Sequence, residues 1–213
     1  MSVRPVPDAP ERGTPERGKA DAELLTRLQR DPSTGAPLVY ARFKADVNRL
    51  VWRLLGADPD HHDLVQQVYI KVFRNCQRLR EPEKFAAWVQ SIAVNSVYEE
   101  LRRREVRRLF LRDAQPSEIY PSLVHDVEVR DQLRRSKAIL EKLPAKERIV
   151  FLLHFLEERS LVEIAETCGY SLATAKRRLA AANRRFESLI SQNPEFVRML
   201  REGRHDDAGE ETE

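Results

Sequence analysis

Glycine and cysteine are scarce in this chain, and both absences exclude structural classes. Only 7 of the 213 residues are glycine, and none lies between Gly56 and Gly169. Because turn-rich β architectures need glycine at positive φ, this scarcity favours helices. The two cysteines, Cys76 and Cys168, form neither a disulfide framework nor a zinc-ligand spacing. We therefore expect a reducing compartment, the cytoplasm, and no metal site.

Long apolar runs and catalytic motifs are also missing. No stretch of about eighteen apolar residues occurs, so we expect no membrane span. The first 20 residues lack the apolar centre of a secretory signal peptide. The sequence contains no nucleophile elbow, no phosphate-binding glycine loop and no metal triad, so neither an enzyme nor a bound cofactor is expected.

Charge is nearly balanced overall but unevenly distributed. There are 37 basic against 34 acidic residues, and the segment 202–213 is rich in acids. Basic residues gather in two runs: Arg102, Arg103, Arg104, Arg107, Arg108 and Arg112, then Lys176, Arg177, Arg178, Arg184 and Arg185. These runs indicate either two anion-binding faces or two solvated helix faces.

The pattern of apolar residues predicts an all-α protein. We expect two small helical domains joined by a flexible linker, the C-terminal one containing a helix-turn-helix. The predicted divisions are a disordered leader (1–20), a first helical domain (21–112), a linker (113–127), a second helical domain (128–202) and a disordered acidic tail (203–213).

Apolar positions with helical spacing define the helices of the first domain. One helix spans 38–55 and ends at Gly56, and the next carries a buried stripe of Leu64, Val65, Val68 and Val72. A third segment with helical spacing of apolar residues starts at Phe85 and continues into the first run of arginines. The polar stretch 77–84 separates these last two helices.

The second domain carries the stronger functional motif. Ser160 and Glu163 form a capping box, Gly169 lies in a tight turn, and Ser171 caps a following basic helix. A short helix, a glycine turn and a basic helix are typical of a helix-turn-helix, whose second helix enters the DNA major groove. An ordinary helical hairpin with a basic surface is the alternative.

Two segments resemble bacterial sigma factors. From Leu143 onward, the sequence LPAKERIVFLLHFLEERSLVEIAETCGYSLATAKRRLAAANRRF is similar to their region four. The segments DHHDLVQQVYIKVFR (60–74) and FAAWVQSIAVNSVYEELRRR (85–104) are similar to their region two. With only these two regions evident, the layout resembles the extracytoplasmic-function (ECF) group.

This resemblance implies two partners, bacterial core RNA polymerase and promoter DNA. The polymerase would be contacted at its β′ clamp helices and β flap. The helix at 60–74 would dock on it through Asp63, Gln66, Gln67, Ile70 and Arg74. Members of this group are often held by an anti-sigma protein, which makes such a protein a further candidate partner.

The resemblance also implies two DNA sites. The helix from Phe85 would bind the separated −10 strand through Trp88, Ser91, Asn95, Glu99, Arg102 and Arg103, and the loop 77–84 would capture a flipped base. The −35 duplex would be read by Ser171, Ala173, Thr174, Lys176, Arg177, Arg178 and Arg184. Arg177 and Asn183 depart from the residues usual in the family, so an unusual promoter preference is expected.

Several alternatives stay open at this level. Trp88 is either a stacking platform for a base or a core aromatic residue, and the core role is favoured. His61 and His62 are interpreted as a polar first helical turn, because a third metal ligand is missing. For the whole chain, a DNA-binding regulator that works without polymerase and a purely helical interaction module are the competing hypotheses.

Overall fold

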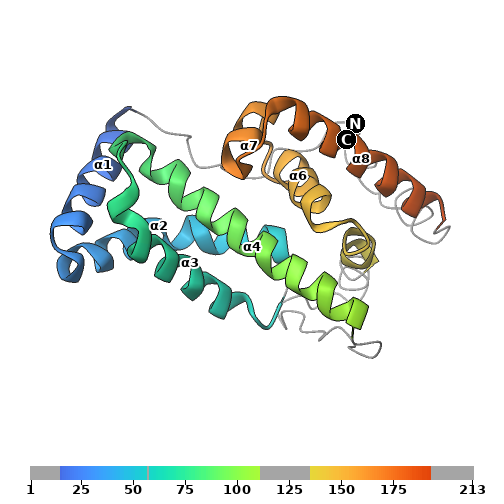
Figure 1. Cartoon of the computed structure of the whole chain (residues 1–213), viewed down its shortest axis with the longest axis horizontal. Helices are drawn as coiled ribbons and strands as arrows, with labels where there is room; N and C mark the ends of the chain where they lie inside the picture. The colour runs from blue at the N-terminus through green and yellow to red at the C-terminus, as the bar shows by residue number, and fades with distance from the viewer. Residues whose placement is uncertain (1–14, 57, 111–134, 193–213) are drawn as a thin grey trace, which may run out of the picture.

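All regular secondary structure among the residues that the structure describes is helical. The computed structural model describes residues 15–56, 58–110 and 135–192, and these contain no β-strand. The first unit comprises α1 (Pro15–Arg30), α2 (Pro32–Leu55), α3 (His61–Asn75), two 3-10 turns, η1 (Cys76–Arg78) and η2 (Pro82–Lys84), and α4 (Phe85–Phe110). The second unit comprises α6 (Ala145–Phe155), α7 (Leu161–Cys168) and α8 (Leu172–Ser191), preceded by a helical turn at 135–140 (Figure 1).

Helix α1 corrects one sequence prediction. The helix begins at Pro15, so residues 15–20 are helical and do not belong to a disordered leader. Its apolar face is small, with only Leu25 and Leu28 fully buried. An ion pair supplements it, because the Asp21 carboxylate accepts a hydrogen bond from Arg42 Nη2 of α2 at 2.9 Å and lies 2.8 Å from Arg42 Nε. The rest of the predicted leader, the linker 113–127 and the tail 203–213 lie outside the described residues.

Helices α1 and α2 approach each other closely at a glycine. Gly35 is buried on α2, and a Cβ atom there would lie 2.4 Å from the Cα of Leu28. A side chain at this position is therefore excluded without a backbone shift. Asp31 connects the two helices and caps α2 by accepting the Ser33 N–H at 3.0 Å. The first unit thus includes α1 as an integral element.

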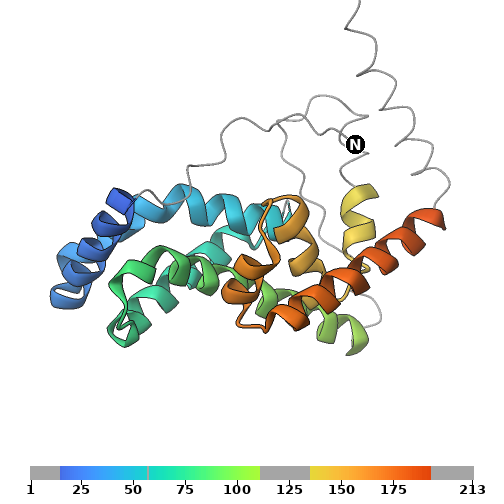
Figure 2. The same cartoon turned by 90° about the horizontal axis from the view of Figure 1, so that it is seen from above.

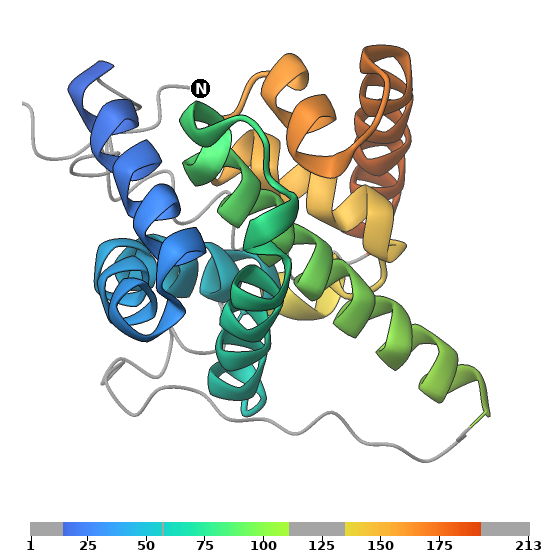
Figure 3. The ribbon, with the colours of Figure 1, turned by 60° about the vertical axis from the view of Figure 1, so that its left-hand side comes forward.

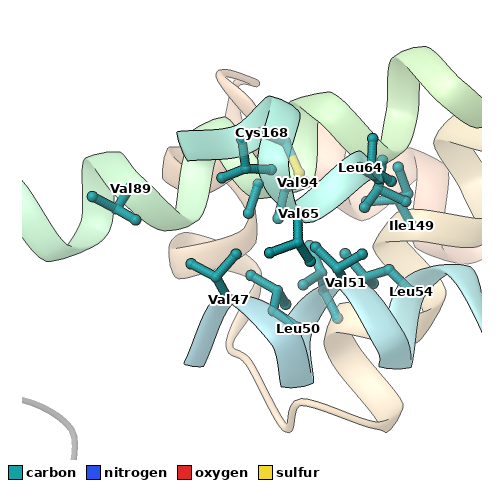
Figure 4. Packing of buried hydrophobic residues seen from close by; sticks show 14 of the residues in the cluster. Val47, Leu50, Val51, Leu54, Leu64, Val65, Val89, Val94, Ile149 and Cys168 are labelled. Carbon is teal, nitrogen blue, oxygen red and sulfur yellow. The ribbon is translucent and has the colours of Figure 1, made fainter. Parts of the chain in front are cut away.

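The two predicted domains pack against each other. Buried side chains of α2, α3, α4, α6, α7 and α8 belong to one continuous apolar core. Figure 4 shows Ile149 of α6 and Cys168 of α7 among side chains of the first unit. Figures 1 and 2 place α6 and α7 beside α4, with α1 at the far end of the molecule. Both domains therefore bury apolar surface in a shared interface.

A buried arginine completes this interface. Arg148 of α6 is 6% exposed, and its Nη2 donates to the carbonyl oxygens of Leu54 and Leu55 at 3.4 and 3.3 Å. These carbonyls belong to the last turn of α2, where helical carbonyls have no partner within the helix. A cation is also favourable at this negative end of the helix dipole. Nearby, Arg53 and Glu157 form an ion pair of 2.8 Å across the same boundary.

Replacing Arg148 by methionine is expected to destabilise the protein. The buried carbonyls of α2 would lose a charged donor, which costs about 1–3 kcal/mol of the free energy of unfolding. Urea unfolding followed by tryptophan fluorescence measures this change. The control is Lys142→Ala, which removes an exposed cation from the same half of the chain. An Arg148→Met midpoint equal to that of the unmodified protein contradicts the capping role.

Candidate nucleic-acid and protein interfaces

Helix α3 presents the predicted docking residues on one exposed face. Its opposite face is buried through Leu64, Val65, Val68, Tyr69 and Val72. The five predicted residues are all exposed: Asp63, Gln66, Gln67, Ile70 and Arg74. Ile70 is 46% exposed, an apolar side chain within an otherwise polar stripe. This arrangement is typical of a protein-docking surface, in which an apolar contact is surrounded by polar ones.

Helix α4 carries the predicted −10 residues along one side, with unequal exposure. Asn95, Glu99, Arg102 and Arg103 are exposed, whereas Trp88 and Ser91 are half-buried. The Glu99 carboxylate pairs with the Lys71 ammonium of α3 at 2.6 Å. Sequence reasoning missed Lys71, which links α3 to the predicted DNA-contacting side of α4. Because the sequence contained no motif that pairs these positions, only the fold brings them together.

Trp88 packs partly into the first unit. Its ring stacks on Phe85 with a centroid separation of 6.2 Å and an interplanar angle of 29°. Phe85 itself is fully buried. One side of the Trp88 ring is thus engaged in packing, as the core interpretation expected. Contact of this ring with a base stays a prediction. Ser91 donates its hydroxyl hydrogen bond to the Trp88 carbonyl oxygen at 2.8 Å.

Arg104 holds the start of α3 against α4. Its guanidinium bonds Asp58, Asp60 and Glu100, with distances of 3.0 Å to Asp60 and 2.6 Å to Glu100. Burial acts to raise the pKa of the Asp58 carboxyl, but the hydrogen bonds and charge of Arg104 outweigh it and hold that pKa below its usual value. The same partners raise the pKa of Arg104. This network joins the segment before α3 to α4.

We expect this network to make stability acid-sensitive. Because the pKa of Asp58 is lower in the folded state, its contribution is complete above the ordinary carboxyl pKa of about 3.9 and is lost as the pH falls through the folded value. Arg104→Met should lower the melting temperature at pH 7. Between pH 7 and pH 3, the melting temperature of this variant should fall less than that of the unmodified protein. Thermal unfolding between pH 3 and 7 measures this, with the exposed Arg102→Met as control. Identical pH profiles of both variants contradict the prediction.

The helix-turn-helix is present as the sequence predicted. Ser160 and Glu163 form the full capping box of α7, and Gly169 adopts φ +66°, the left-handed conformation that ends this helix. Ser171 caps α8 by accepting the Thr174 N–H at 3.2 Å. Small buried Ala165 and Ala175 lie in α7 and α8, and these two helices contact each other.

The predicted −35 residues divide into two groups. Ala173, Lys176, Arg177 and Arg184 are exposed on α8. Ser171 and Thr174 take part in the cap, and the Arg178 guanidinium lies 4.0 Å from the ring centre of Tyr170. That cation–π contact gives Arg178 a structural role in the turn. Two apolar residues of the helix-turn-helix are also exposed: Val162 of α7 and Leu172 of α8, 53% and 40% exposed.

The family comparisons agree with this geometry. The model of the family "Sigma-70 region 2" matches residues 39–107, which cover α3 and most of α4. The model of the family "Sigma-70, region 4" matches residues 134–185, which cover α6, α7 and most of α8. This chain belongs to the ECF group of sigma factors. Helix α1 precedes both matched segments of the sigma factor.

Individual relatives of the sigma factor are distant but consistent. The ECF RNA polymerase sigma factor SigE of Mycolicibacterium smegmatis is 29% identical over 157 residues, covering 69% of this chain and 58% of SigE. The ECF RNA polymerase sigma factor SigW of Bacillus subtilis is 26% identical over 147 residues, covering 64% of this chain and 79% of SigW. The match thus spans less than two thirds of SigE.

A solved structure shares the fold of the sigma factor. The sigma factor RpoE in complex with the anti-sigma factor NepR from Bartonella quintana aligns with a TM-score of 0.53 and 20% sequence identity. The alignment covers 74% of this chain and 97% of that chain. This likeness supports the two-unit helical architecture.

In the described part of the sigma factor, neither a group of metal ligands nor a membrane-spanning helix is present, and the reactive form of the Cys168 thiol is disfavoured. Within residues 15–56, 58–110 and 135–192, no group of three His, Cys, Asp or Glu side chains could hold a metal ion. His61 instead contacts the Asn48 side-chain oxygen at 3.2 Å. Burial raises the pKa of the Cys168 thiol to about 11, so the reactive thiolate is disfavoured. Among the same residues, no helix is long and apolar enough to cross a bilayer.

Proposed function

We propose that this sigma factor binds core RNA polymerase and directs it to promoters with defined −10 and −35 elements. Polymerase would perform the chemistry of RNA synthesis, and this chain would bind, position and help to open the duplex. The site of action would be the cytoplasm, where bacterial polymerase works. The observation that carries the proposal is that both matched regions expose separate polar faces on helices α3, α4 and α8.

Each face is assigned one partner. The α3 face, with Ile70 among polar residues, would dock on the β′ clamp helices, and the region-four unit would contact the β flap. The α4 side with Asn95 and Arg102 would bind the separated −10 strand, where cations track the backbone. The start of α8, with Lys176 and Arg177, would enter the −35 major groove.

The packing of the second unit against α4 leaves these faces accessible. Region four contacts α4 through Tyr98, over which Lys146 lies at 5.5 Å, and through Glu105, which accepts the Ala145 N–H at 2.6 Å. Asn95, Arg102 and Lys176 remain exposed in this arrangement. An anti-sigma partner, as in the RpoE structure with NepR, would act by covering such faces.

Capture of purified core polymerase tests the proposal. Immobilised sigma factor is expected to retain core polymerase in a one-to-one ratio at physiological salt. A DNA-binding regulator that works without polymerase, or a plain helical interaction module, predicts no capture. Absence of capture, with the sigma factor shown to be folded, therefore overturns the proposed function.

A further inference from the structure

Helix α1 is bonded to the loop that joins α3 to α4. The side-chain amide of Gln29, in the last turn of α1, donates to the carbonyl oxygens of Cys76 and Leu79 at 2.8 and 3.2 Å. In return, the side-chain amide of Gln77 donates to the Gln29 carbonyl oxygen at 2.8 Å. Three hydrogen bonds therefore join residues that lie about fifty positions apart. Figure 3 shows α1 beside the start of α4.

The loop also has contacts of its own: Cys76 is buried, Leu79 packs against the apolar core, and Glu81 pairs with Lys84 at 2.6 Å. It consists of the 3-10 turns η1 and η2 with an extended stretch between them, and Gln77, Arg78 and Arg80 are exposed. Within it, the Leu79 N–H bonds the Cys76 carbonyl oxygen at 3.2 Å. Gln29 donates to both ends of this turn, so its amide fixes the distance between Cys76 and Leu79.

Helix α1 is a rigid support for this loop. Leu25 and Leu28 are fully buried, and Gly35 allows α2 to lie against the backbone of Leu28. The Asp21–Arg42 ion pair holds the other end of α1. Because α1 cannot shift easily, the two carbonyl oxygens bonded by Gln29 are held in a fixed place relative to α4.

We propose that Gln29 is a positioning residue for −10 recognition: it holds the loop 76–84 in the conformation that selects the flipped base. The inference rests on the proposed function and on the base capture that the family resemblance implies for residues 77–84. Helix α1 lies outside the segment that matches region 2, so the role comes from the contacts of this chain. A loop held by fixed hydrogen bonds binds with less loss of entropy and discriminates more sharply between bases.

The test compares base selectivity in the assembled holoenzyme. Labelled single-stranded −10 oligonucleotides carry each of the four bases at each position, and their affinities are measured for three variants. Gln29→Met keeps the side-chain length but removes the donors, and Gln29→Lys keeps donors. Asn48→Ala is the control, because Asn48 also donates its amide to a backbone carbonyl, that of Lys44 at 2.7 Å, and its oxygen contacts His61 at the start of α3 rather than the loop.

Gln29→Met is expected to reduce the affinity spread among the four bases at one position by about tenfold, as the loss of two hydrogen bonds allows. Gln29→Lys and Asn48→Ala should keep the spread, and the affinities for core polymerase and −35 duplex should not change. A spread unchanged in Gln29→Met, or lost equally in Gln29→Lys, overturns the positioning role. If the unmodified holoenzyme shows no base selectivity at any position, the proposed function fails as well.

Hydrogen exchange provides a second readout that does not depend on DNA. Gln29→Met is expected to speed amide exchange in residues 76–84 while that in α3 and α4 stays unchanged. A general loss of protection across the first unit would show that Gln29 acts on folding alone, which overturns the specific role. Unchanged protection of the loop would overturn it too.

Discussion

Replacing Lys176 and Arg177 by alanine is expected to weaken binding to −35 duplex DNA by roughly 30-fold or more. Both side chains are exposed near the start of α8, which the proposed function places in the major groove. Each lost contact to a base edge or phosphate costs about 1–3 kcal/mol, and the two together give this factor. Alanine favours helix, so α8 itself should persist.

Salt dependence separates a DNA contact from a folding defect. If both cations contact phosphates, the slope of log affinity against log salt should fall by about two in magnitude. Lys142→Ala is the control, because it removes an exposed cation outside α7 and α8. Arg178 is left in place, since its guanidinium packs over Tyr170 and its loss would disturb the turn. Equal affinities of the double variant and the control contradict the assignment of α8.

Ile70→Glu is expected to weaken binding to core polymerase by roughly 30-fold or more. The side chain is 46% exposed in the middle of the α3 stripe, where a partner would bury it. Central residues of interfaces often contribute about 2 kcal/mol or more, and a buried unpaired carboxylate adds a desolvation cost. The measurement is a titration of labelled sigma factor with core polymerase.

The matched control for Ile70→Glu is Leu38→Glu. Leu38 is 39% exposed on α2 and lies outside the predicted docking stripe. Glutamate is well tolerated on exposed helical surface, so both variants should fold. Affinity for −35 duplex DNA should stay unchanged in both. Retention of full polymerase affinity by Ile70→Glu, or an equal loss in Leu38→Glu, contradicts the α3 docking face.

The helices that carry repeated apolar stripes were predictable from the sequence. Leu64, Val65, Val68 and Val72 recur with helical spacing, and the structure buries all four while it exposes Gln66, Gln67 and Ile70 between them. The helix-turn-helix was equally legible, because its caps are local hydrogen bonds between residues three apart, as at Ser160. Local periodicity and local caps need no knowledge of tertiary contacts.

Elements held by long-range contacts were not predictable. Helix α1 has a buried face of little more than Leu25 and Leu28, and its remaining support comes from Arg42 and the loop after α3. Arg148 stands within an apolar helix, and only its tertiary partners explain its burial. Helical spacing groups Phe155 with the buried residues Leu152 and Ile149, yet it is 52% exposed at the end of α6.

The central claim is that this chain directs polymerase to promoters, and run-off transcription tests it most directly. Purified core polymerase and a pooled promoter library are incubated with and without the sigma factor. We predict transcripts with defined starts that appear only with the sigma factor and that share one −10 and one −35 sequence. Identical transcripts in both reactions, from an active core polymerase that captures the sigma factor, would contradict the account.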